Sequence, residues 1–567
     1  MALKNTPVIT LGIHDGHNAG AALIRDGEVL SAISEERLNN IKNFSGVPAL
    51  AIKKVFEIAN VQPGDVSSIA IASLLRLDDP MKVEGNKLHF LAENIAPLMH
   101  QKWFIKNSVF ILHKFRKIKG ITQVLNELGI GDKKIYFIEH HLTHAACAYY
   151  QRPWDDKTLI LTLDGMGDGL SATVNIGTGF NIQRIAQTSF YDSIGNNLYS
   201  EITAFLGMKR WEHEYKIMGL APYGRYEGVI DSLKKAIRVN PEKPLEFENI
   251  SGHYLKKMQL FYQKALAGQR FDNIAAGTQK LFEELVLEWV KNSIKETKIK
   301  KLVCAGGSFL NVKLNKLIRE LNEVSDVFFY PAAEDGGTAV GAAMEGYYRY
   351  CQNNKTKAKK INITNVYYGQ SFSSDEIEEF IKSKKLRFAK KVTSDQVAKL
   401  LSEGKIIARF SGRDEWGPRA LGNRSIMADP RNMSVIRKIN FAIKMRDFWM
   451  PFASAVLEED QSRYFKKSRF APYMVEAFDT KKDAEKEIIA GLHPYDLTGR
   501  PQIVNHWNPG WQEIIRSFKK ITGVGGLLNT SFNLHGYPLV GSLETALWTF
   551  RNSGLDGLLI EDWLIEK

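Results

Sequence analysis

The sequence predicts an α/β protein with an internally duplicated first part and a separate α/β domain after it. Residues 7–37 and 158–188 share one order: apolar strand, acidic glycine-containing turn, strand, tight turn, strand. Such a repeated unit indicates an internal duplication. Further on, KKLVCAGGSFLNVKLNKLIREL and DQVAKLLSEGKIIARF each combine a helical pattern with a strand-like run, which is typical of α/β folds.

The composition describes a multidomain globular protein. A chain of 567 residues is too long for one hydrophobic core, so two to four domains are expected. The net charge of +13 permits a polyanionic partner, although a general bias toward lysine, isoleucine and asparagine explains it equally well. There is no signal-peptide pattern and no membrane-spanning apolar run, which favours a cytoplasmic location. The scattered cysteines agree with a reducing compartment: Cys147, Cys304 and Cys351.

A polar, basic stretch predicts the domain boundary. Residues 352–360, QNNKTKAKK, show no apolar periodicity and are the best linker candidate. We therefore expect a first domain over residues 1–351, a linker over 352–362 and a second domain over 363–567.

Two histidines and two acids predict a metal site. His140 and His144 are four residues apart, so on a helix both rings project from one face. Asp164 ends the apolar run TLILTL, and Asp335 is a second acid in a glycine-rich turn after a strand. Together they offer four ligands to one ion. The alternative is that His141 and His144 are partly exposed polar residues of a helix.

Glycine-rich turns after strands predict a nucleotide site. Without Cβ atoms, glycines let backbone N–H groups approach phosphate oxygens. Each turn alone fits an ordinary hairpin, but paired turns in a duplicated frame favour nucleotide binding. The small residues Ala339, Gly341, Ala342 and Ala343 are expected to serve helix packing instead. The predicted nucleotide-binding residues are Gly165, Gly167, Gly306, Gly307 and Asn311.

Basic loops in the second half predict recognition of an anion. Arg419 and Arg424 lie in GPRALGNRS, and Lys444 and Arg446 precede an apolar run. Asn529, Thr530, Ser531 and Asn533 follow another strand-like run. Arginine and lysine beside hydroxyl and amide groups suit phosphate or carboxylate. A solvated basic face is the alternative, and it explains residues 382–391 well.

The motifs in order resemble the O-carbamoyltransferase family, which includes antibiotic-tailoring and nodulation-factor carbamoyltransferases. The resemblance is carried by GHNAGAAL, HHLTHAACAYY, LDGMGDG, EYKIMGLAPYG, CAGGSFLN, EDGGTAVGAA, GPRALGNRSI and IKMRDFWMPFA, and covers nearly the whole chain. The first part is similar to the tRNA threonylcarbamoyladenosine synthase and hence to the duplicated actin, sugar-kinase and heat-shock-ATPase fold. The second part is similar to threonylcarbamoyladenylate synthases.

The resemblance implies ATP-dependent carbamoyl transfer to an acceptor hydroxyl. Carbamoyl phosphate would yield carbamate in the second domain, carbamate would attack ATP, and the carbamoyl adenylate would meet the acceptor in the first domain. The metal would be iron(II), ahead of zinc or manganese, bound by His140, His144, Asp164 and Asp335, and Mg²⁺ would accompany ATP. Carbamoyl phosphate would be bound by Arg419, Arg424, Lys444, Arg446, Asn529 and Ser531.

His17, in the turn GHNAG, is the predicted catalytic residue. The family resemblance places a histidine there, and imidazole takes up a proton near neutral pH, as an acceptor hydroxyl requires. Stabilising the departing AMP is a second role, and a structural hydrogen bond is the alternative. His14, three residues earlier, ranks below it.

The expected partner is a small-molecule or glycan acceptor, not a nucleic acid, and a homodimer is compatible with the sequence. Residues 101–120 are basic and interleaved with aromatics, so they suit either peripheral contact with an anionic surface or a docked helix with one wet face. Three rival functions share some of these motifs: a sugar or acid kinase, a non-enzymatic ATP-gated switch and a tRNA-modifying enzyme.

Overall fold

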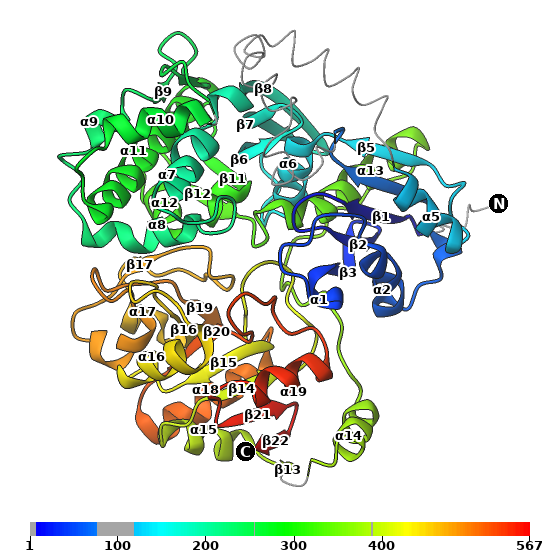
Figure 1. Cartoon of the computed structure of the whole chain (residues 1–567). Helices are drawn as coiled ribbons and strands as arrows, with labels where there is room; N and C mark the ends of the chain where they lie inside the picture. The colour runs from blue at the N-terminus through cyan, green and yellow to red at the C-terminus, as the bar shows by residue number, and fades with distance from the viewer. Residues whose placement is uncertain (1–6, 76–117, 255, 387–388) are drawn as a thin grey trace. The chain divides into compact units, whose positions relative to one another are not determined.

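The computed structural model describes residues 7–75, 118–254, 256–386 and 389–567 (Figure 1). The chain forms two compact units. Unit 1 comprises Met1–Leu30 and Ser45–Ile363, and unit 2 comprises Ser31–Phe44 and Thr364–Lys567. Within residues 101–120, the segment 101–117 lies outside the described residues, so its predicted surface contact stays a prediction. In the described part of the chain, no helix has both the length and the apolar character needed to cross a membrane.

The first sheet of unit 1 has the strand order β3-β2-β1-β4-β5. The central strand β1 is antiparallel to β2 and parallel to β4, which is parallel to β5. All residues of β1 and β4 are buried, as expected for strands covered on both faces. The strands are β1 (Ile9–His14), β2 (Gly20–Arg25), β3 (Glu28–Ser34), β4 (Ser68–Ala72) and β5 (Ile135–Ile138).

The second sheet repeats the first. Its order is β12-β11-β6-β7-β8; the central β6 is antiparallel to β7 and parallel to β11, which is parallel to β12. Counted from the central strand, the two sheets therefore have the same strand order and connectivity. This confirms the predicted duplication and the α/β class. The strands are β6 (Thr158–Gly167), β7 (Leu170–Thr178), β8 (Asn181–Ser189), β11 (Lys301–Ala305) and β12 (Asp326–Phe329).

Two helices, α6 (His140–Tyr150) and α13 (Thr338–Asn353), pack together and support the site residues. A Cβ on Gly341 would stand 1.9 Å from the carbonyl oxygen of Thr143, and one on Gly12 would stand 2.1 Å from that of Ala339. Neither position tolerates a side chain, so the small residues of α13 are packing residues, as predicted. A longer helix of this unit is α11 (Phe271–Thr297).

A group of shorter elements belongs to the second half of unit 1. They include the π-helix η5 (Gly195–Ser200), α7 (Glu201–Phe205), α8 (Glu214–Leu220), α10 (Lys256–Ala265) and α12 (Val312–Arg319). Asn311 caps α12, because its side chain accepts a hydrogen bond from the Leu314 amide.

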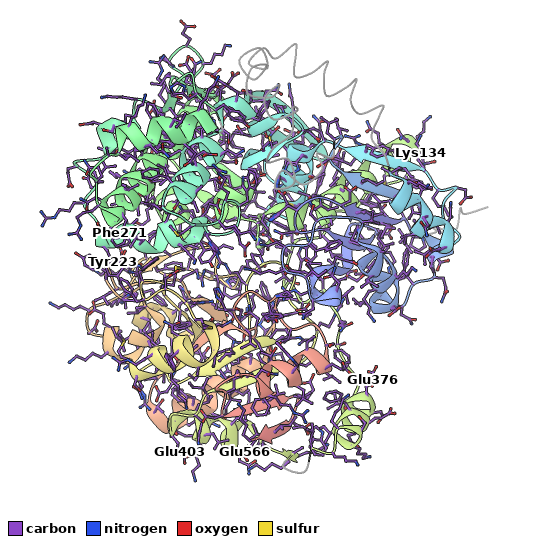
Figure 2. All side chains as sticks on the ribbon, in the orientation of Figure 1. Lys134, Tyr223, Phe271, Glu376, Glu403 and Glu566 are labelled. Atoms are coloured by element: carbon purple, nitrogen blue, oxygen red, sulfur yellow. The ribbon has the colours of Figure 1, made fainter. Side chains whose placement is uncertain are left out.

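Unit 2 is built on a mixed eight-stranded sheet, ordered β13-β22-β21-β14-β15-β20-β16-β19. Neighbouring residues alternate between two apolar cores: Ile407 belongs to one and Ala408 to the other, and Leu527 and Leu528 divide in the same way. Side chains fill both faces of the sheet, while charged residues such as Glu403 lie at the periphery (Figure 2). Helices therefore cover both faces of this α/β unit.

The strands of unit 2 are β13 (Ala389–Lys391), β14 (Ile407–Phe410), β15 (Arg424–Ala428), β16 (Ala453–Leu457), β19 (Gln502–Val504), β20 (Gly526–Ser531), β21 (Gly557–Ile560) and β22 (Trp563–Glu566). Helices α15 (Ser394–Ser402) and α18 (Pro509–Thr522) contribute to one core. Helices α14 (Ser374–Ser383), α16 (Ser434–Ile439) and α19 (Leu543–Arg551) contribute to the other.

Candidate metal centre and anion site

The two predicted histidine ligands lie on one face of α6. Glu139 caps this helix by accepting hydrogen bonds from the amides of His141 and Leu142, which sets the first turn. The Nε2 atoms of His140 and His144 are 3.1 Å apart. His140, His141 and His144 are all buried, so the alternative of partly exposed helix residues is wrong.

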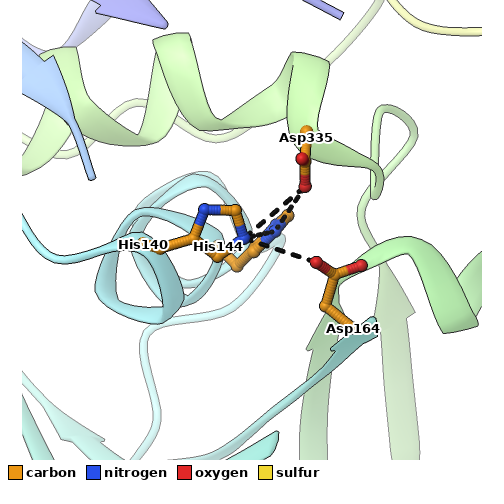
Figure 3. A group of neighbouring side chains, drawn as sticks. All are labelled: His140, His144, Asp164 and Asp335. Carbon is orange, nitrogen blue, oxygen red and sulfur yellow. Dashed lines mark hydrogen bonds and ion pairs between the residues drawn. The ribbon is translucent and has the colours of Figure 1, made fainter. Parts of the chain in front are cut away.

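Two carboxylates complete the cluster, one near the end of β6 and one in the 3-10 turn η8 (Asp335–Gly337), directly before α13 (Figure 3). Asp164 Oδ2 lies 3.4 Å from His140 Nε2. Asp335 Oδ1 lies 3.5 Å from the Nε2 atoms of both histidines. One ligand atom from each residue lies within 4.8 Å of all the others. The structure thus brings all four predicted residues together.

The cluster fits a divalent cation. Ligand atoms about 2.1 Å from a tetrahedral ion lie about 3.4 Å from one another, close to the separations seen here. Burial lowers the pKa of His140, but the charges of Asp335 and Asp164 outweigh it and raise that pKa to about 10. The histidines in turn hold the pKa values of both aspartates below their ordinary range, against the opposing effect of burial. The two carboxylates therefore give the cluster a negative charge that a bound cation would neutralise.

Groups behind His140 fix its orientation. Ser73 Oγ lies 3.1 Å from Nδ1 of His140, which leaves Nε2 for the cluster. A Cβ on Gly167 would stand 2.0 Å from the His140 ring, so only glycine fits beside it. Asp168 accepts hydrogen bonds from the amides of His140 (2.7 Å), Leu74 (2.7 Å) and Leu75 (2.8 Å). This carboxylate joins the end of β4 to the first residue of α6.

We expect Asp168→Asn to weaken metal binding about 10- to 100-fold, the usual cost of losing an outer partner of a metal ligand. The carboxamide turns an N–H donor toward amides that need an acceptor, which loosens the start of α6. Competition with a chromophoric chelator measures the affinity. Asp156→Asn, which changes an exposed carboxylate, is the control. Equal affinity in Asp168→Asn and the parent chain contradicts the orienting role.

The glycine turns predicted to bind nucleotide contact the same centre. The Gly307 amide donates a hydrogen bond to Asp164 Oδ1 at 3.0 Å. Gly306 has φ of +105°, and a Cβ there would stand 2.2 Å from the carbonyl oxygen of Leu163. Asn311 is committed to its helix cap and to Gln279. The glycines therefore shape the loop beside Asp164, and their contact with a nucleotide stays a prediction.

The structure gives His14 and His17 different surroundings. His14 is buried, its Nε2 lies 2.9 Å from the His17 carbonyl oxygen, and its charge interacts with that of Asp335. Burial lowers the pKa of His14 to about 4, although Asp335 and Asp15 oppose this. His17 is half-buried, three residues further along the same turn. His14 is thus the neighbour of the metal cluster, while the catalytic role of His17 stays a prediction.

Unit 2 gathers basic side chains around Lys444. Its ammonium is buried and donates to Ser531 Oγ (3.1 Å), Asn533 O (2.9 Å) and Asn533 Oδ1 (2.6 Å). Burial and the charges of Arg446 and Lys42 hold the pKa of Lys444 well below its ordinary value. Burial and the charges of Arg419 and Arg446 likewise hold the pKa of Arg500 well below its ordinary value. Mutually repelling cations of this kind are relieved by a bound anion.

The comparisons with known families decide the identity of the chain. The family model described as Carbamoyltransferase N-terminus matches residues 9–344, and that described as Carbamoyltransferase C-terminus matches residues 398–567. The chain belongs to the carbamoyltransferase family. Unit 1 carries most of the first match and unit 2 carries the second.

Named relatives agree with this carbamoyltransferase assignment. Nodulation protein NolNO of Sinorhizobium fredii is 31% identical over 567 residues, which cover 97% of this chain and 79% of the relative. The 3'-hydroxymethylcephem-O-carbamoyltransferase of Amycolatopsis lactamdurans is 27% identical and covers 50% of this chain and 52% of the relative. Among solved structures, full-length HypF in its phosphate- and nucleotide-bound form matches with a TM-score of 0.37 and 13% identity, over 63% of this chain and 57% of that one.

Two of the residues predicted to bind carbamoyl phosphate also brace loops of this carbamoyltransferase. Arg424 is fully buried, and its guanidinium donates to main-chain carbonyls, among them those of Ser411 (2.8 Å) and Gln370 (3.1 Å). Asn529 is buried and donates to the Ala420 carbonyl oxygen at 3.2 Å. These contacts support main-chain loops of unit 2. Binding of carbamoyl phosphate by Arg419, Arg424, Lys444, Arg446, Asn529 and Ser531 stays a prediction.

Sequence reasoning missed two members of the basic cluster, Arg500 and Lys42. Arg500 stands in TGRPQ, between a glycine and a proline, and this resembles the setting of Arg419 in GPRA. That local pattern was a usable signal. Lys42 lies in residues 31–44, which join unit 2 although they are distant from it in sequence, and no local pattern announces this.

Proposed function

We propose that this carbamoyltransferase transfers a carbamoyl group from carbamoyl phosphate to an acceptor hydroxyl, with ATP and a carbamoyl adenylate intermediate. The basic cluster of unit 2 carries the proposal, because Lys444, Arg446 and Arg500 offer several positive charges to one small anion. A kinase of similar fold needs no such second site. The relative named for its 3'-hydroxymethylcephem acceptor supports a hydroxyl as the group modified.

The reaction divides into three balanced steps. Water cleaves carbamoyl phosphate to carbamate and phosphate; carbamate then attacks the α-phosphate of ATP and releases pyrophosphate. The acceptor hydroxyl attacks the carbamoyl carbon, loses its proton and releases AMP. Carbamate is a poor acyl donor, and adenylation gives it a good leaving group.

Residues of unit 2 would bind and orient the first two substrates. The Lys444 ammonium is held in place by Ser531 and Asn533, and its positive charge would attract an anionic oxygen nearby. Arg419, Arg446 and Arg500 add donors that match phosphate oxygens.

Residues of unit 1 would serve the transfer step. His140, His144, Asp164 and Asp335 would hold a divalent metal, which anchors phosphate oxygens and acts as a Lewis acid. His17 would take the proton of the acceptor hydroxyl.

The direct test is to incubate the full chain with ATP and labelled carbamoyl phosphate and to measure AMP and pyrophosphate. We expect both products, in equal amounts, only when carbamoyl phosphate is present. If a hydroxyl-bearing acceptor is then added, ADP together with a phosphorylated acceptor would indicate a kinase instead. ATP binding without any carbamoyl phosphate consumption would indicate a switch protein.

His17→Asn is expected to bind metal and release pyrophosphate normally, yet to transfer the carbamoyl group about 100- to 10,000-fold more slowly, the usual range for general-base catalysis. His14→Asn is the matched comparison. Because His14 interacts with Asp335, we expect His14→Asn to change the metal affinity as well as the rate of carbamoyl transfer. Near-normal transfer by His17→Asn, with a large loss in His14→Asn, would give the catalytic role to His14.

A further inference from the structure

The loop that carries Arg419 is held by one buried carboxylate, that of Glu415. Its Oε1 accepts hydrogen bonds from the amides of Leu421 (2.8 Å), Asn423 (2.8 Å) and Arg424 (3.1 Å). Glu415 is buried, and its Oε2 has no hydrogen-bond partner among the residues that the structure describes. A single side-chain oxygen therefore gathers three main-chain donors of this loop.

The backbone of the loop needs such support, because it belongs to no helix and no sheet between residues 417 and 423. Gly417 and Gly422 have φ of +101° and +108°, conformations that glycine adopts far more readily than other residues. The Gly422 amide donates to Ser425 Oγ at 2.9 Å. Side-chain contacts, and not a ladder of main-chain hydrogen bonds, therefore set the shape of the loop.

The main chain is held on both sides of Arg419. Arg37 Nη2 donates to the carbonyl oxygen of Gly417 at 3.1 Å, and Asn529 donates to the carbonyl oxygen of the residue after Arg419 at 3.2 Å. The Arg419 side chain is half-buried, and its charge acts on that of Arg500. The place of this guanidinium beside Arg500 thus depends on a loop that cannot shift without breaking several hydrogen bonds.

The reach of the Glu415 side chain matters more for these contacts than its charge does. Burial and the charge of Asp414 raise the pKa of Glu415, although Arg424 opposes this. A neutral carbonyl-type oxygen in the place of Oε1 would accept the same three N–H groups. A side chain one methylene shorter would instead withdraw the oxygen by about 1.5 Å, which is too far for all three bonds.

We propose that Glu415 is a positioning residue of the basic cluster, which through the loop amides sets the Arg419 guanidinium where it meets a phosphate group together with Arg500. Glu415 itself touches no substrate. A guanidinium binds phosphate oxygens in a fixed fork geometry, so a displacement of about 1 Å is costly. The inference rests on the proposed binding of carbamoyl phosphate by unit 2.

The test measures the affinity of the full chain for inorganic phosphate by isothermal titration calorimetry. Glu415→Asp keeps the charge but loses the reach, and we expect it to bind phosphate about tenfold or more weakly, because a hydrogen bond to a charged group is lost. Glu415→Gln loses the charge but keeps the reach, and we expect it to bind like the parent chain. A merely structural role would lower the melting temperature and the number of active chains, not the affinity of the folded ones.

Two further variants show whether Glu415 acts through Arg419. Arg419→Met is expected to weaken phosphate binding, and Glu415→Asp is expected to add nothing in that background, because the two residues would share one effect. Asp556→Asn is the matched control, since Asp556 accepts the Ile406 amide at 2.8 Å in another part of unit 2. It is expected to bind phosphate like the parent chain.

Absence of phosphate binding to the parent chain overturns the inference. Parent-like affinity in Glu415→Asp, equal losses in Glu415→Asp and Glu415→Gln, or a full additional loss in the Arg419→Met background would overturn it as well. Failure of the proposed function has a different signature. Phosphate binding that follows the expected order, without pyrophosphate release from ATP and carbamoyl phosphate, counts against carbamoyl adenylation and leaves the positioning role of Glu415 in place.

Discussion

His144→Ala should yield a folded chain that contains no bound metal and transfers carbamoyl groups more than about 100-fold more slowly. Losing an outer partner of a metal ligand already costs about 10- to 100-fold, and His144 would be a direct ligand. Its Nε2 is within 3.5 Å of both His140 Nε2 and Asp335 Oδ1, so its loss removes one of the four candidate ligand atoms. Plasma mass spectrometry on the purified chain gives the metal content.

His141→Ala is the matched control for this experiment. His141 is buried on the same helix, and its Nδ1 lies 2.8 Å from Thr162 Oγ1. Its ring packs beside that of His140, but it is not one of the four candidate ligands. It removes the same atoms from the same core, so both variants have a similar cavity cost. We expect His141→Ala to keep one metal per chain. A full equivalent of metal in both His140→Ala and His144→Ala would rule out the site.

Lys444→Met should abolish carbamoyl-phosphate-dependent pyrophosphate release while sparing transfer from supplied carbamoyl adenylate. Methionine fills a similar volume but cannot donate a hydrogen bond to an anion. The loss should exceed about 100-fold, because charge stabilisation by one preorganised donor contributes about that much. Lys438→Ala is the control, since it removes a lysine that pairs with Asp556 at 2.9 Å, outside the basic cluster. Equal loss of both partial reactions in Lys444→Met would contradict the division of labour between the units.

The sequence predicted the parts of the site that local patterns determine. His140 and His144 share a helix face, and Asp164 ends an apolar strand, so residue spacing alone places them. Their meeting with Asp335, in the short turn η8 (Asp335–Gly337) directly before α13, depends on the packing of two halves of the duplicated frame. The repeated turn pattern in the sequence indicated this duplicated frame, and the two sheets do share the same strand order.

Other assignments depended on features that spacing does not contain. Arg419 and Arg424 share one motif, yet Arg424 turns inward to main-chain carbonyls. Nothing in GPRALGNRS shows which arginine faces the core. Lys42 joins the basic cluster because residues 31–44 belong to unit 2, a long-range arrangement that no local pattern encodes. Which of His14 and His17 lies nearer the metal cluster likewise depends on how the turn folds toward Asp335.

The most direct measurement of the central claim is carbamoyl-phosphate-dependent exchange of labelled pyrophosphate into ATP, made on the parent chain, His144→Ala and Lys444→Met. Exchange reports formation of the adenylate and does not require an acceptor. Our account predicts exchange in the parent chain and in His144→Ala, and none in Lys444→Met. Absence of exchange in the parent chain, or exchange in Lys444→Met at the parent rate, would contradict it.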